Sequence, residues 1–131
     1  METKVKNPKE EFKQKFQRKL VMFTVETLKL CKRLRKDRTL WEVADQLARS
    51  AASIGANVSE AKGSGSMRGY RNYFEIALKS ANETGYWFTV ISEFEVDTNE
   101  SLEKLKSELQ EITRILGASI LTMKGRRFQD S

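Results

Sequence analysis

Residues 46–63 read Gln-Leu-Ala-Arg-Ser-Ala-Ala-Ser-Ile-Gly-Ala-Asn-Val-Ser-Glu-Ala-Lys-Gly, and they carry the clearest structural signal in the chain. Apolar residues recur here at intervals of three and four, which keeps them on one face of an α-helix. Thr39 and Glu42 have the spacing of a capping box, and the glycine-rich residues 63–66 favour a left-handed helix end. We therefore predict a helix over residues 39–62. Its apolar stripe consists of Leu40, Ala44, Leu47, Ala51, Ile54, Val58 and Ala61.

Three further segments have the same periodicity. Asn7 and Pro8 form a helix start, because asparagine can cap the first turn and proline is tolerated within it. Ser66 and the segment Asp97-Thr98-Asn99-Glu100 offer caps for two more helices. The four predicted helices span residues 8–36, 39–62, 67–95 and 98–124, and residues 125–131 are expected to fray.

These helices predict the fold class. The helix over residues 67–95 has apolar residues on two neighbouring stripes, so we expect other helices to cover most of its circumference. Connections of only a few residues between long helices place consecutive helices antiparallel. The prediction is an all-α protein, an antiparallel up-down-up-down four-helix bundle in which residues 1–131 form a single domain.

The amino-acid composition indicates the cellular compartment of the protein and determines its charge. Cys31 is the only cysteine, so no internal disulfide can form, and no apolar run is long enough to cross a bilayer or resembles a secretion signal. We expect a cytoplasmic protein without a membrane partner. The formal charge of +6 is uneven, since residues 1–38 carry +8 and residues 83–111 carry −6. A basic segment of this kind indicates either an anionic partner or charge complementarity between subunits.

Four blocks of the sequence resemble a known family. They are Gln46-Leu47-Ala48-Arg49-Ser50-Ala51, then Ser53-Ile54-x-x-Asn57-Val58-x-Glu60, the glycine-rich turn, and Phe74-x-x-Ala77-x-x-Ser80-x-x-Glu83. In order and spacing they resemble the bacterial four-helix-bundle proteins encoded by intervening sequences in 23S ribosomal RNA genes. The resemblance implies a homo-oligomer, commonly a ring-like pentamer, and a role with RNA or other nucleic-acid complexes.

Polar residues interrupt the apolar faces of the second and third predicted helices. One interpretation is a binding or catalytic cluster, and the other, which we favour, is a structural network that locks the two helices in register. Within it we expect an ion pair between Glu83 and Arg49. The candidate network residues are Arg49, Ser53, Asn57, Glu60, Ser80 and Glu83.

The residue types needed for most catalytic sites are missing. The chain has no histidine, which excludes a Ser-His or Cys-His relay and the Glu-x-x-His pairs of a di-iron bundle. Cys31 lies beside Leu30 in a helical pattern, where a small packed residue is favoured over a nucleophile. We assign no catalytic residue, no metal ligand and no cofactor, and expect a protein that is not an enzyme.

Basic residues gather at two places that could contact phosphate. The larger cluster ends the first predicted helix, where positive charge also suits the helix dipole, so a solvated helix end explains it equally well. The smaller one flanks the glycine-rich turn, which is either an anion site at a helix start or a plain turn. The candidate nucleic-acid-binding residues are Lys29, Lys32, Arg33, Arg35, Lys36, Arg38, Lys62, Arg68 and Arg71.

Small residues around the second predicted helix would let another backbone approach closely, either within the bundle or from a second subunit. We favour the subunit interface, and five copies at +6 each would carry about +30. The leading hypothesis is therefore a homo-oligomeric, pentameric scaffold that binds structured RNA or DNA through phosphates. The alternative is a protein-interaction module that docks a partner protein, such as a nucleic-acid enzyme, on the acidic residues 83–111.

Overall fold

The structure, a computed structural model, describes residues 7–95 and 99–129. It consists of helices joined by short connections, in agreement with the predicted all-α class. A short 3-10 turn, η1, covers Arg38–Leu40. The α-helices are α1 (Pro8–Leu34), α2 (Trp41–Ala61), α3 (Met67–Phe94) and α4 (Glu100–Gln129).

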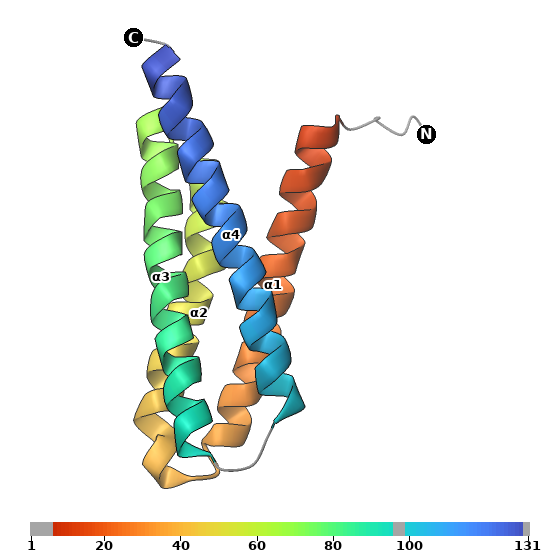
Figure 1. The fold of residues 1–131 in the computed structure, drawn as a ribbon, viewed down its shortest axis with the longest axis vertical. Helices are drawn as coiled ribbons and strands as arrows, with labels where there is room; N and C mark the ends of the chain where they lie inside the picture. Colours follow the sequence, from red (N-terminus) through yellow and green to blue (C-terminus); the bar gives the residue numbers. More distant parts are fainter. Residues whose placement is uncertain (1–6, 96–98, 130–131) are drawn as a thin grey trace.

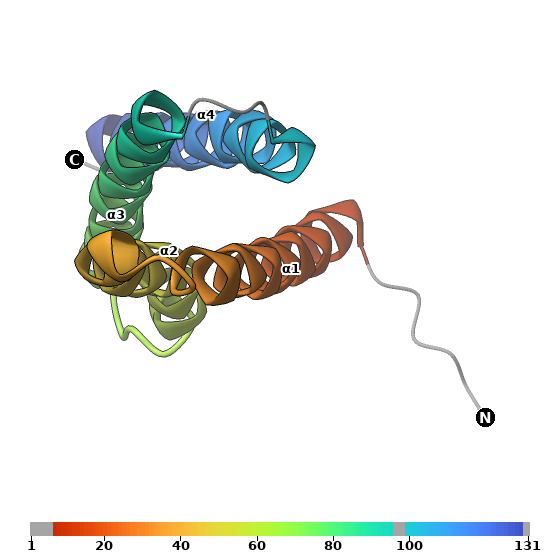
Figure 2. The ribbon, with the colours of Figure 1, turned by 90° about the horizontal axis from the view of Figure 1, so that it is seen from below.

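The helices form an open bundle in which α2 and α3 pack against each other, opposite the opening between α1 and α4. Along the chain they alternate in direction, with α1 packed on α2 and α4 packed on α3 (Figure 1). Seen along the bundle, α1 and α4 are the two arms of a C, and they contact each other far less than each contacts its neighbour (Figure 2). The N-terminal half of α1 diverges from the C-terminal half of α4 (Figure 1).

The periodic stripes form the core. All seven residues of the predicted stripe are buried, Leu40 in η1 and the other six in α2, and they join buried residues of the other three helices in one cluster. Phe23 of α1 meets Phe88 of α3 edge to face, with ring centroids 6.2 Å apart. Phe12 lies four residues before the buried Phe16 on the same face of α1, but its side chain is 52% exposed because α4 has diverged from α1 at that level.

Three of the four expected caps are present. Asn7 accepts a hydrogen bond from the Glu10 amide at 2.8 Å, and Ser66 accepts one from the Gly69 amide at 3.0 Å. Asn99 accepts from the Ser101 amide at 2.9 Å, whereas the expected contributions of residues 97 and 98 lie outside the described residues.

The capping box predicted at Thr39 is wrong. Asp37 accepts a hydrogen bond from the Thr39 amide at 3.0 Å, and the 3-10 turn that follows delays the start of α2 to Trp41. The left-handed end predicted at residues 63–66 is also wrong, because no glycine in the described part of the chain has a positive φ. Instead, the Gly63 amide bonds Glu60 O at 3.0 Å, which tightens the last turn of α2.

Two helices end more than one residue away from the predicted position. α1 ends at Leu34 rather than residue 36, and α4 continues to Gln129, so residues 125–129 are helical instead of frayed. A lone Gly125 costs about 1 kcal/mol relative to alanine, which does not suffice to end a helix of this length. Nowhere in the described residues is a helix both long and apolar enough to span a membrane.

The close approach of α1 and α2 can be tested at Gly55. A Cβ placed there would lie 3.4 Å from Leu20 Cβ, so a larger side chain must push α1 away. Gly55→Leu should lower the free energy of unfolding by about 1–3 kcal/mol in a urea titration. Gly117→Leu is the matched control, since a Cβ at Gly117 meets no atom within 4 Å and leucine improves helix propensity. Equal effects at the two glycines would contradict this packing.

Candidate nucleic-acid interface

The larger basic cluster lies at one end of the bundle, where α1 ends and η1 begins. Its six members, from Lys29 to Arg38, are all exposed. Lys32 and Lys36 have no carboxylate partner among the described residues. These two lysines therefore present unneutralised ammonium groups to solvent.

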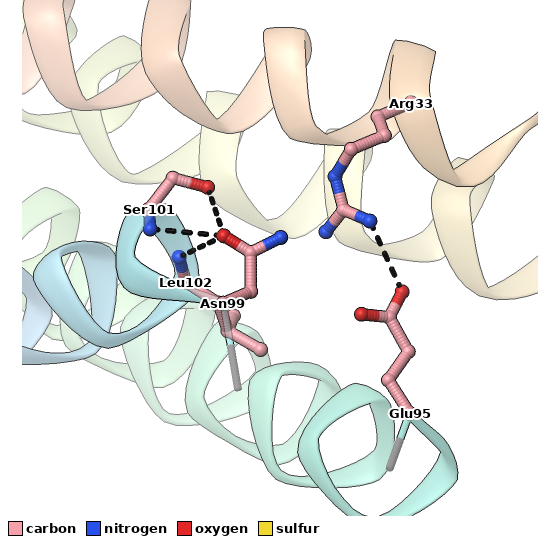
Figure 3. A network of polar contacts seen from close by, with 5 residues as sticks. All are labelled: Arg33, Glu95, Asn99, Ser101 and Leu102. Carbon is pink, nitrogen blue, oxygen red and sulfur yellow. Dashed lines mark hydrogen bonds and ion pairs between the residues drawn. The ribbon is translucent and has the colours of Figure 1, made fainter. Parts of the chain in front are cut away.

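Three other members of the cluster form ion pairs with carboxylates. Arg35 pairs with Asp45 at 2.7 Å, and this hydrogen bond raises the pKa of Arg35. Arg33 donates to Glu95 at 3.4 Å across the space between α1 and the end of α3, close to the Asn99 cap of α4 (Figure 3). Lys29 pairs with Glu26 at 3.2 Å. Exposed pairs like these contribute about 0–1 kcal/mol each, so an incoming phosphate can replace the carboxylate.

An aromatic ring belongs to the same surface, which sequence reasoning missed. The Arg38 guanidinium lies 5.3 Å from the centroid of the Trp41 ring, and Trp41 Nε1 donates to Arg35 O at 2.8 Å. Half of the Trp41 side chain is exposed. An exposed ring beside cations is a surface on which an unpaired base can stack. The sequence could have indicated this ring, because Trp41 follows Arg38, the last residue of the basic cluster, by three positions.

The smaller basic set lies at the other end of the molecule. Lys62, Arg68 and Arg71 flank the turn between α2 and α3, and the 21 residues of α2 separate them from the larger cluster by about 30 Å (Figure 1). Arg71 is also unsuited to phosphate contact, because its side chain is only 16% exposed and lies 3.6 Å from Glu75. On one subunit the nine candidates therefore form two surfaces.

Lys62 belongs to a hollow that the sequence did not reveal. Where α1 and α4 diverge, a groove of about 740 Å³ opens, and we call it the α1–α4 groove. Its walls are largely apolar, with Phe16, Phe74 and Met123 among them, and its charged lining residues are Lys9, Lys13 and Lys62. Within the described residues no carboxylate lines it.

Part of the predicted polar network exists. Asn57 Nδ2 donates to Ser53 Oγ at 3.0 Å, and Ser80 Oγ of α3 donates to the same Ser53 Oγ at 2.9 Å. A second pair was missed, in which Thr84 Oγ1 lies 2.9 Å from Ser50 Oγ in the core. The sequence could have indicated this pair, because both hydroxyl residues lie among the apolar stripes of their helices. The two pairs join α2 to α3 at two levels.

The charged members of that predicted network do not take part. Arg49, Glu60 and Glu83 are exposed, and among the described residues no ion pair joins Arg49 to Glu83. The expected pair is therefore wrong. Short hydroxyls fit between two helices in close contact, whereas these longer charged side chains are solvated outside the seam.

The groups that could support catalysis or metal binding are few. Cys31 is buried, its Sγ lies 3.4 Å from Ala44 O, and burial raises the pKa of the thiol, which keeps it protonated. In the described portion of the chain no group of three or more Cys, Asp or Glu residues is placed to hold a metal ion. The chemistry that the surface supports is binding by charge and stacking.

Comparison with known proteins identifies the class of protein. The family of 23S rRNA-intervening sequence proteins matches residues 13–118, so the chain belongs to this family. It is similar to a protein of unknown function from the S23 ribosomal protein family of Bacteroides thetaiotaomicron, whose crystal structure has been solved. The two are 34% identical with a TM-score of 0.75, and the match covers 80% of this chain and 97% of that chain. No curated protein matches.

The buried hydroxyl pair between α2 and α3 should be energetically coupled. Thr84→Val keeps the shape but leaves Ser50 Oγ without its interhelical partner, so it should lower the free energy of unfolding by about 1 kcal/mol. A double-mutant cycle with Ser50→Ala should give a coupling of about 0.5–1 kcal/mol in urea unfolding. Glu83→Ala is the control and should change stability by less than about 0.5 kcal/mol. A coupling near zero would contradict the role of this pair.

Burial of Cys31 predicts slow reaction with thiol reagents. The native protein should react with a disulfide reagent on the order of 100-fold more slowly than the protein in urea, because the thiol is inaccessible and protonated. The measurement is the rate of reagent absorbance at pH 8. A native rate close to the unfolded one would place Cys31 on the surface.

Proposed function

We propose that this protein is a non-enzymatic, homo-oligomeric, pentameric scaffold of the cytoplasm that binds structured RNA or DNA through phosphate contacts. The observation that carries the proposal is the exposed basic end of α1, where Lys32 and Lys36 have no carboxylate partner and Trp41 lies beside Arg38. Membership in a family named after intervening sequences of 23S rRNA supports an RNA ligand.

Assembly would strengthen this surface. Phosphate contacts are individually weak, and their number sets both affinity and salt dependence. Five copies would present five such ends, so that one nucleic acid could contact several of them at once. Large apolar side chains that are exposed on the single chain support an oligomer, since solvent would otherwise surround them. They include Phe12, Ile76, Tyr86 and Phe94.

A second function draws on the acidic part of the molecule. Residues 83–111 carry a formal charge of −6 and include Glu93, Glu100 and Glu103, which are exposed at the end of α3 and the start of α4. Such a surface could dock a basic partner protein, for example a nucleic-acid enzyme. Nuclease treatment before a pull-down separates the two functions, because a protein partner survives it and an RNA-bridged one does not.

Charge reversal tests the proposed nucleic-acid surface. The triple variant Lys32→Glu, Arg33→Glu and Arg35→Glu should bind a fluorescent RNA hairpin or DNA duplex at least about 10-fold more weakly at low salt. The slope of log affinity against log salt should also become shallower by about 2–3 per subunit engaged. Fluorescence anisotropy over a salt series measures both.

Two further variants sharpen this experiment. Lys32→Glu with Lys36→Glu breaks no internal ion pair, so a loss of affinity there cannot come from altered packing. Lys15→Glu with Lys104→Glu makes the same change in net charge at exposed residues elsewhere on the surface and should retain more affinity. Binding that is absent at low salt, or that falls equally in both double variants, would contradict the proposed site.

A further inference from the structure

We propose that the α1–α4 groove of one subunit receives the outer face of α3 from a second copy of the chain. This inference rests on the oligomeric part of the proposed function and names the two surfaces that would make it. One surface is apolar with a basic rim, and the other is an apolar ridge with acidic flanks.

The groove has the features of a helix-binding site. Phe12 and Met67 line it with side chains that are 52% and 47% exposed, which is unusual for large apolar residues beside a core. Lys13 lies over the Tyr70 ring at 5.7 Å, and Lys9 and Lys62 complete the basic rim. An apolar helix face with acidic flanks matches such a groove in both shape and charge.

The outer face of α3 provides such a helix. At 100° per residue, its exposed residues Ile76, Tyr86 and Phe94 fall within one arc of about 100° together with the exposed Glu83 and Glu93. We call this arc the α3 outer face. It also contains the half-buried Val90 and one lysine, Lys79, so its charge is acidic overall.

The two surfaces cannot meet within one subunit. Phe74, which lines the groove, is nine residues before Glu83 and therefore points to the opposite side of α3. The groove walls on α1 and α4, residues 9–17 and 115–123, each extend about 12 Å, and the span from Glu83 to Phe94 is about 16 Å. A segment of about two to three helical turns from a second copy therefore suits the length of the groove.

The contact would be head to tail. Because the groove and the α3 outer face are different surfaces, each copy that docks leaves one unused surface of each kind. Such a contact closes into a ring when the rotation between copies allows it and otherwise grows into a filament. It also leaves the basic end of α1 outside the groove, at the other end of the bundle (Figure 1).

Complementary defective variants test the inference. A groove variant, Lys13→Glu with Lys62→Glu, and a face variant, Tyr86→Ser with Phe94→Ser, change residues outside the core. Light scattering after size exclusion should show each variant as a monomer at concentrations about 100-fold above those at which the natural chain assembles. Mixed at equal amounts, the two should form a heterodimer and nothing larger, because only one intact groove and one intact face remain.

The control is a variant of an exposed apolar residue outside both surfaces. Leu121→Ser removes another exposed apolar side chain and should assemble like the natural chain. Circular dichroism should show equal helix content in all variants, and equal melting temperatures at a concentration low enough that every chain, the natural one included, is monomeric. Variants that assemble normally, or a mixture that stays monomeric, would overturn this interface but leave the nucleic-acid surface standing if Lys32→Glu with Lys36→Glu still weakens RNA binding. A natural chain that is monomeric, with the groove filled by a fatty acid or another protein, would overturn the inference and the oligomer together.

Discussion

The close pairing of α2 with α3 is the constraint on which the rest of the structure depends. Small side chains, including Ala51, Ala77 and Ala81, are fully buried along this seam, so the two backbones approach closely. Two hydroxyl pairs cross it, and buried hydroxyls that lose a partner cost about 1–3 kcal/mol. A shift of one turn would separate both pairs, so the seam has one favourable register.

The shape of the molecule follows from that seam. Helix α1 packs on α2 and α4 packs on α3, each on its own side, so the contact between α1 and α4 is left as the weakest one. Lys19 and Glu111 join these arms at 2.9 Å, and beyond this pair the arms diverge. The divergence exposes Phe12 and opens the groove, while the other end of α1 carries the unpaired lysines. The apolar groove with its basic rim and the basic end of α1 therefore lie at opposite ends of the bundle.

Periodicity predicted the faces of the helices but not the distances between them. The apolar stripe from Leu40 to Ala61 is buried throughout, because any neighbouring helix can cover an apolar stripe, whichever helix it is. Whether Lys62 lies near Lys36 depends on the length and direction of α2, and the fold puts them at opposite ends. The groove was not predictable, since it comes from the angle between α1 and α4. The Thr39 cap failed for a local reason, because Asp37 caps a 3-10 turn over residues 38–40 and α2 begins only after that turn.

Native-state hydrogen exchange tests the α2–α3 seam most directly. If this pairing is the stable centre, amides near Ala51 and Ala81 should exchange most slowly, with an opening free energy close to that of global unfolding. Amides of residues 9–17, on the diverging arm of α1, should exchange faster by several orders of magnitude in dilute protein. Exchange in α2 and α3 that is as fast as in residues 9–17 would contradict the account.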